Sequence, residues 1–117
     1  MILKDLATSL NLTNLTPELA AEESYDVSAG HVSDLLSDVL AHAPAGGLLV
    51  TIQVHLNVIA VAVHAGLVAV VFAGGMTPEE AVREKAVEER VLLYSFPRSA
   101  FDLVGKLYSM GVRGAHA

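Results

Sequence analysis

The chain has 117 residues and a mass of 12.3 kDa, a length typical of one domain with one hydrophobic core. The absence of cysteine excludes disulfide frameworks and thiolate chemistry, and a 53% share of apolar residues excludes intrinsic disorder. A formal charge of -6 argues against nucleic-acid binding. We expect a cytoplasmic protein with a single domain over 1–117, folded over about 1–111 with a flexible tail at 112–117.

The N-terminal third predicts two helices separated by extended and loop segments. Apolar residues at near-helical spacing predict a short helix over 2–10, and 12–15 follow as an extended piece before a polar loop. Residues 25–29 alternate modestly and are compatible with a strand. After Gly30, apolar side chains recur with the helical period over 31–41, which predicts an amphipathic helix.

The middle of the chain is apolar and free of formal charge, so it has to be compared with a membrane span. No Asp, Glu, Lys or Arg occurs from Val39 to Pro78, but polar residues and glycines interrupt every window of about 20 residues. No membrane partner is therefore expected. The Val- and Leu-rich runs at 48–52 and 67–72 instead predict parallel strands covered on both faces, with a helix over 56–65 between them.

The C-terminal third continues the alternation of helix and strand. Thr77-Pro78-Glu79-Glu80 predicts a helix start with Thr77 as N-cap, and this helix continues to about Arg90. A buried strand at 91–94 is followed by a helix over 100–110 that Ser95 or a neighbour caps and Gly111 ends. The apolar face of that last helix is predicted to consist of Phe101, Val104, Leu107 and Tyr108.

This order of elements predicts an α/β fold, a three-layer α/β/α sandwich with a mainly parallel sheet. Ligands of such sheets gather at the carboxyl ends of the strands, so polar residues and glycines at those positions are the candidates for a binding site. The candidates are Gly30, His31, Ser33, Asp34, Thr51, Gln53, His55, Asn57, Gly74, Gly75 and Ser95.

Two parts of this set have a structural alternative beside the functional one. Thr51, Gln53, His55 and Asn57 alternate, so in an extended segment their side chains would share one side, where they bind either a ligand or other groups of the protein or of a homodimer. Gly74-Gly75 lies between a strand and a helix, where it either holds an anion through backbone N–H groups or forms a tight turn.

We expect no catalytic residues, no metal and no cofactor. Gly105-Lys106 lacks both the upstream glycine and the following Ser or Thr of a phosphate-binding loop. His31 and Asp34 are three residues apart, a spacing too common to indicate a metal site. No nucleophile elbow supports a triad built from Ser33, His55 and Asp34, so a small enzyme is the least favoured reading.

Three segments, 30–39, 49–57 and 70–75, together resemble the DRTGG domain family, and the resemblance covers most of the chain. Gly74 and Gly75 match the Gly-Gly of that family's motif, whereas its Asp-Arg-Thr aligns with Val54, His55 and Leu56. The resemblance implies a small α/β sandwich similar to the N-terminal regulatory domain of HPr kinase/phosphorylase.

The resemblance also implies a regulatory or interaction module that acts as a homodimer or through a partner enzyme. Together with the clustering of the candidate residues at the strand ends, it leads us to expect a ligand-sensing role, with a small anionic metabolite as the candidate ligand. A pure protein-interaction subunit without a small ligand is the alternative. HPr serine kinase activity is not expected, because in the larger enzyme it resides in a separate P-loop domain for which this sequence has neither the length nor the Walker A lysine.

Overall fold

The computed structural model describes residues 1–115, and the last two residues of the predicted tail, His116 and Ala117, lie outside the described residues. Its strands form one five-stranded sheet in the order β1-β5-β4-β3-β2, in which only β1 runs antiparallel to its neighbour. The strands are β1 (Thr13–Asn14), β2 (Gly30–Val32), β3 (Leu48–Thr51), β4 (Ala69–Phe72) and β5 (Leu92–Ser95).

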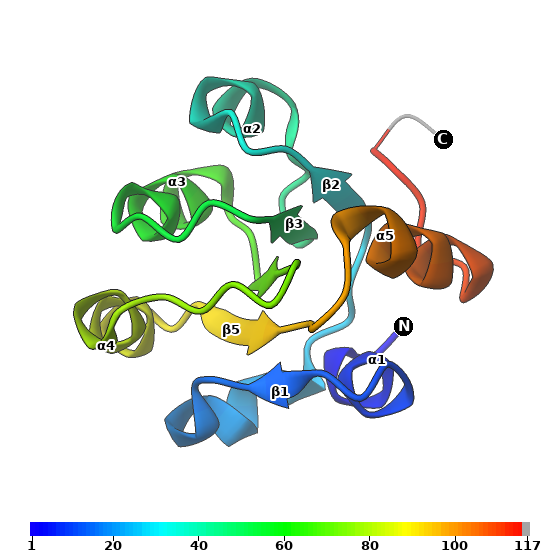
Figure 1. The fold of residues 1–117 in the computed structure, drawn as a ribbon, viewed down its shortest axis with the longest axis horizontal. Helices are drawn as coiled ribbons and strands as arrows, with labels where there is room; N and C mark the ends of the chain where they lie inside the picture. Colours follow the sequence, from blue (N-terminus) through cyan, green and yellow to red (C-terminus); the bar gives the residue numbers. More distant parts are fainter. Residues whose placement is uncertain (116–117) are drawn as a thin grey trace.

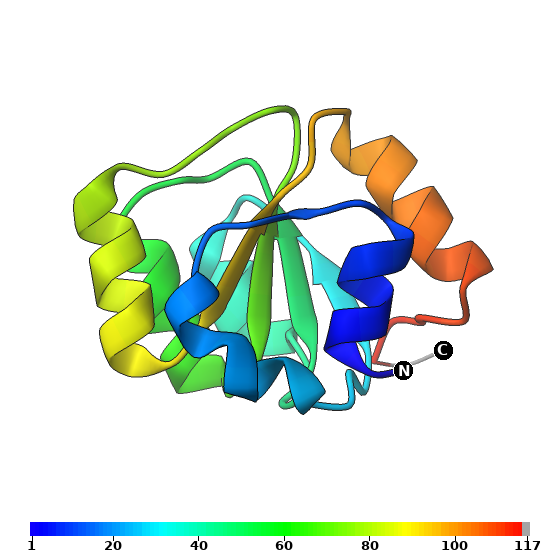
Figure 2. The ribbon, with the colours of Figure 1, turned by 90° about the horizontal axis from the view of Figure 1, so that it is seen from below.

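Helices cover both faces of this sheet (Figures 1 and 2). One layer consists of α2 (Leu36–His42), α3 (Asn57–Ala65) and α4 (Glu80–Glu89), and the other of α1 (Leu3–Ser9) and α5 (Ala100–Ser109), with the 3₁₀ helix η1 (Pro17–Ser24) beside β1. The predicted three-layer α/β/α sandwich with a mainly parallel sheet is confirmed.

Two hydrophobic clusters, one on each face, explain the charge-free middle of the sequence. Leu48 and Val50 belong to the cluster under α1 and α5, whereas Leu49 belongs to the cluster under α2, α3 and α4. Every residue of β3 and β4 is buried because both faces are covered. None of the described helices is long and apolar enough to cross a membrane.

Most predicted elements are confirmed, but the segment around β2 is a correction. Residues 25–29, which were compatible with a strand, do not form one; instead Gly30–Val32 pairs in parallel with Leu48–Val50. The helix predicted over 31–41 is therefore shortened to α2, which begins only at Leu36. Residues 30–32 form ladder hydrogen bonds with the free edge of β3. A single additional turn at the start of a short helix would provide less stabilisation than this pairing, so the segment becomes a strand.

Two further boundaries differ from the prediction. The loop predicted after residue 15 contains η1, and α4 begins at Glu80 without a side-chain cap from Thr77. Two backbone bonds tie the start of this connection to the neighbouring loop: Gly74 N donates to Arg98 O at 2.6 Å and Gly75 N donates to Phe96 O at 3.0 Å. The connection between β4 and α4 therefore contacts the loop after β5, at the carboxyl ends of the parallel strands, before α4 begins.

The last helix faces the sheet with a side that agrees only in part with the predicted one. Leu107 is buried and Val104 packs against the core, as predicted, but Phe101 and Tyr108 do not belong to this face. Leu103 and Leu107 are buried, whereas Phe101 is 87% exposed and Tyr108 is 56% exposed. Ser99 caps this helix by accepting a bond from Asp102 N at 3.2 Å. Beyond it, Val112 N donates to Leu107 O and Gly30 N donates to Arg113 O, so the start of the predicted tail contacts the domain.

Candidate functional site

The Asp34 side chain accepts hydrogen bonds at the end of β3. Its Oδ1 accepts bonds from Thr51 Oγ1 and from Ile52 N, both at 2.8 Å, and Thr51 Oγ1 accepts a further bond from Gln53 N at 3.0 Å. Thr51 is fully buried, so its hydroxyl needs these partners. The structure thus brings two of the candidate residues, Asp34 and Thr51, into direct contact, and the contact stabilises the loop that follows the strand.

Gln53, His55 and Asn57 do not form one polar side of an extended strand. His55 N donates to Gln53 Oε1 at 3.3 Å, and Asn57 N donates to His55 Nδ1 at 3.1 Å. These side chains therefore turn back onto the backbone two residues ahead and lead the chain into α3. A neutral His55 in this arrangement carries its proton on Nε2, which leaves that N–H free toward solvent.

Gly74 and Gly75 form a tight turn with φ of +70° and +71°. Both amide groups donate bonds to the β5–α5 connection, as described above, so neither is available to an anion without a rearrangement. A Cβ on Gly74 would lie 3.6 Å from the side chain of Ile52, which places this turn beside the loop after β3. Ser95 ends β5, paired with Thr13 and Phe72.

The remaining candidates, Gly30, His31 and Ser33, lie on or just after the edge strand β2. Because side chains alternate along a strand, His31 points to the α2 side, where its Nε2 donates to Asp38 Oδ2 at 2.8 Å. Ser33 Oγ accepts a bond from Leu35 N at 3.1 Å, in a turn before α2. Gly30 lies instead beside the C-terminal segment, away from the loop after β3.

The pair of His31 and Asp38 predicts an acid-dependent contribution to stability. The hydrogen bond from His31 is the main cause that holds the pKa of Asp38 below its ordinary value. The ionised carboxylate therefore stabilises the fold above its unfolded-state pKa of about 3.9, and this contribution is lost as the pH falls through the lower folded-state pKa. We expect Asp38→Asn to melt at a lower temperature than the wild type at about pH 6, and this difference to shrink as the pH falls toward about 2.

Thermal melts monitored by circular dichroism between these pH values measure the difference. Asp5→Asn is the matched control, because Asp5 is exposed on α1 and makes no side-chain ion pair among the described residues. A melting difference for Asp38→Asn that stays constant across the acid range would contradict the role of this carboxylate.

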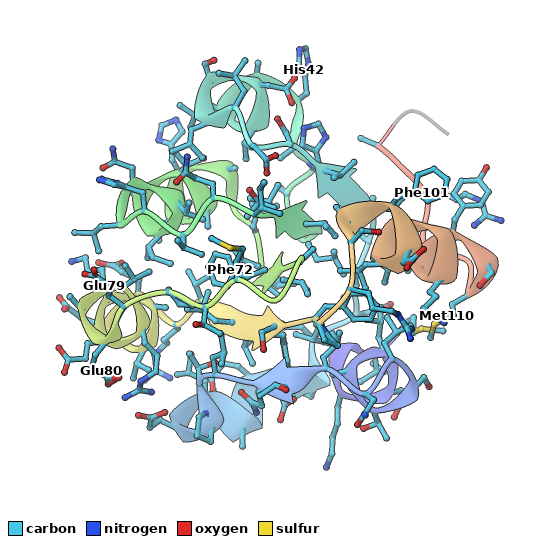
Figure 3. All side chains as sticks on the ribbon, in the orientation of Figure 1. His42, Phe72, Glu79, Glu80, Phe101 and Met110 are labelled. Atoms are coloured by element: carbon cyan, nitrogen blue, oxygen red, sulfur yellow. The ribbon has the colours of Figure 1, made fainter. Side chains whose placement is uncertain are left out.

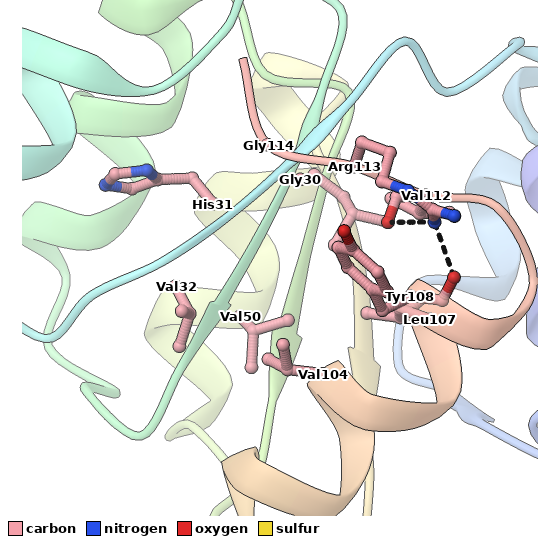
Figure 4. Close-up of a pocket in the computed structure, with 11 residues that line it drawn as sticks. Gly30, His31, Val32, Val50, Val104, Leu107, Tyr108, Val112, Arg113 and Gly114 are labelled. Atoms are coloured by element: carbon pink, nitrogen blue, oxygen red, sulfur yellow. Dashed lines mark hydrogen bonds between the residues drawn. The ribbon is translucent and has the colours of Figure 1, made fainter. Parts of the chain in front are cut away.

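The structure contains a cavity that the sequence did not predict. It has a volume of about 350 Å³ and lies between β2, β3, α5 and the segment 112–114 (Figure 4). Only Gly30 and His31 of the predicted candidates line it. The sequence signal was weak, because the lining comes from four segments and consists mainly of valines and leucines that also read as ordinary core. Within residues 1–115, no group of three or more His, Cys, Asp or Glu residues is placed to hold a metal ion.

Comparison with known proteins supports the fold. No protein-family model matches the sequence, and no curated protein sequence matches it. A solved structure of the CBS and DRTGG domains of the regulatory region of a Clostridium perfringens pyrophosphatase, complexed with its activator diadenosine tetraphosphate, is similar to this chain with a TM-score of 0.72 and 12% identity. The similarity covers 88% of this chain and 44% of that chain, so the present chain spans less than half of it. The chain thus has the fold of part of a regulatory region that contains CBS and DRTGG domains.

Proposed function

We propose that this chain is a non-catalytic regulatory domain of the DRTGG type that acts by self-association through the outer face of α5. The similarity of its fold to a regulatory region supports the regulatory class. The observation that carries the mode of action is the exposure of Phe101, whose ring is almost fully outside the protein on a helix that already has a complete buried face.

The outer face of α5 offers both a projecting side chain and a hollow. Phe101 projects from the first turn of the helix (Figure 3). One turn later Gly105 has no atom within 4 Å of the place where a Cβ would be. A shallow hollow of about 500 Å³ surrounds this glycine, and its lining comes entirely from α5 and the residue before its cap: Arg98, Phe101, Asp102, Gly105, Lys106 and Ser109.

The Phe101 ring and the hollow at Gly105 are complementary in shape, so two copies of this face fit each other. In a twofold arrangement of antiparallel α5 helices, Phe101 of each copy enters the hollow at Gly105 of the other, which is the isologous contact of a closed dimer. The charges fit the same arrangement, because Asp102 lies one turn from Arg98 on one side and from Lys106 on the other. Arg98 Nε lies 3.9 Å from Asp102 Oδ2 of its own chain, so Lys106 is the cation that can face Asp102 of the second copy. A second copy of this chain is thus the partner that this face fits.

The test is the molar mass in solution, measured by light scattering and sedimentation equilibrium. We expect the wild type to form a dimer of about twice 12.3 kDa. Phe101→Ala should weaken the dimer at least about tenfold, as expected for an aromatic side chain at the centre of an interface. Tyr25→Ala is the matched control, because Tyr25 is an exposed aromatic residue outside α5 and should leave the association unchanged.

A wild type that stays monomeric at hundreds of micromolar would overturn self-association. A dimer that Phe101→Ala leaves intact would overturn the α5 interface. Gly105→Leu gives an independent check, because a leucine side chain fills the hollow from within without removing the phenyl ring. We expect this variant to be monomeric as well, with an unchanged helical circular dichroism spectrum.

A further inference from the structure

The cavity beside β2 is placed where the helical layer leaves the sheet incompletely covered. The buried side of α5 packs onto the sheet through Leu103 and Leu107, while the edge strand β2 lies beyond the reach of α1. Val32 on this strand is consequently 49% exposed. The segment after α5 returns over β2, where Val112 Cγ1 would lie 3.3 Å from a Cβ on Gly30. The result is a half-open pocket rather than a bare sheet face.

The walls of this cavity are aliphatic. Its floor is the α5-facing side of β2 and β3, and its opposite wall comes from α5 and the segment after it (Figure 4). The aliphatic lining residues are Val32, Leu48, Val50, Val104, Leu107 and Val112. The His31 side chain points away from this space toward Asp38, so it contributes no charge to the interior. A volume of about 350 Å³ is at the lower end of the range of small-molecule pockets.

A single cationic group lies among the lining residues. The Arg113 guanidinium stacks 3.9 Å from the centre of the Tyr108 ring, and its Nη1 donates to the Tyr108 and Val112 carbonyl oxygens (Figure 4). No carboxylate among residues 1–115 forms an ion pair with it, although the chain carries 13 acidic residues against 7 lysines and arginines. The guanidinium is thus held beside the cavity with donors left for an anion.

We propose that this cavity binds a small amphipathic carboxylate, with its aliphatic or aromatic body between β2, β3 and α5 and its carboxylate at Arg113. An aliphatic interior favours an apolar body, and one guanidinium matches one negative charge by a charge-assisted hydrogen bond. The same chemistry disfavours nucleotides with several phosphates, because a single cation cannot neutralise them and the interior offers no other charged donor. This site is independent of the proposed dimer, since Phe101 does not line the cavity.

The test is a titration of the full chain with octanoate, followed by two-dimensional ¹H–¹⁵N NMR and by isothermal titration calorimetry. We expect saturable binding, with the largest NMR shifts on Val32, Val50, Val104 and Gly114. Octanamide, which has the same chain without the charge, should bind at least about tenfold more weakly, because it lacks the charge-assisted bond. Acetate, which lacks the apolar body, should not bind measurably.

Two variants locate the site. Arg113→Gln should reduce the affinity for octanoate to that for octanamide, and it does not disturb the core because Arg113 is exposed. Val104→Phe fills the cavity and should abolish binding of both compounds, whereas Val63→Phe, at an exposed position on α3, should not change it. The proposal would be overturned if Val104→Phe left the affinity for octanoate unchanged, or if octanoate and octanamide bound with equal affinity. The titration is repeated with Phe101→Ala, the variant that weakens the proposed dimer. Because the cavity is independent of that dimer, this variant should bind octanoate like the wild type, so a failure of octanoate binding is distinguished from a failure of the dimer.

Discussion

Leu103→Ala is expected to lower the free energy of unfolding by about 2–5 kcal/mol, the usual cost of removing a fully buried leucine side chain. Leu103 is 0% exposed and packs in the cluster between α5 and the sheet. The substitution leaves a void that β3 and β4 cannot fill by moving, because both strands are hydrogen-bonded on both sides. Urea unfolding monitored by circular dichroism measures the change.

Phe101→Ala is the matched control on the same helix, since it removes a larger side chain from an exposed position. Its effect on the free energy of unfolding should stay within about 0.5 kcal/mol when both proteins are dilute enough to be monomeric. A loss at Phe101 as large as the loss at Leu103 would contradict the orientation of α5 that the structure shows.

The orientation of α5 also illustrates where prediction from the sequence failed. Apolar side chains occupy more than one side of this helix: Leu103 and Leu107 are buried and Val104 packs against the same core cluster, whereas Phe101 and Tyr108 are exposed. Periodicity predicts the helix correctly, but it cannot decide which of these apolar side chains meet the sheet. That choice depends on how α5 packs beside α1 onto the sheet, which is a property of the assembled layers.

The central strands were predictable because their signal is local. The runs at β3 and β4 are almost entirely apolar, as expected for strands covered on both faces, and each run begins after a glycine, Gly47 or Gly66. The edge strand β2 was missed because it is only three residues long and forms by pairing with β3, across a connection of 15 residues, 33–47. Its residues carry no pattern of their own that distinguishes a strand from the first turn of a helix.

In the candidate site, too, the features that depend on local sequence were predictable and those that depend on distant residues were not. Polar residues at the end of β3 were identified from their position in the sequence, and the structure places them there. Their bonding could not be foreseen, because Asp34 and Thr51 meet across 17 positions and the side chains of Gln53 and His55 bond the backbone. The cavity was missed for the same reason, since its walls come from distant segments without a shared motif.

The bonds of Asp34 imply that this carboxylate is structural, and this can be tested against a binding role. Its Oδ1 receives two bonds, from the buried Thr51 hydroxyl and from Ile52 N. A hydrogen bond to a charged acceptor contributes about 1.5–3 kcal/mol, and a buried hydroxyl that loses its acceptor adds a desolvation cost. A residue whose only role is to bind a ligand would contribute nothing to the stability of the free protein.

We therefore expect Asp34→Ala to lower the free energy of unfolding by about 1.5–3 kcal/mol in the absence of any ligand. Thr51→Val removes the hydroxyl while keeping the shape of the side chain, so in this background Asp34→Ala should cost less than in the wild type. The difference, measured by urea unfolding of the two single variants and the double variant, is the coupling between these residues. If the two effects were additive, the bond between Asp34 and Thr51 would not stabilise the fold, and Asp34 would again be a candidate for binding.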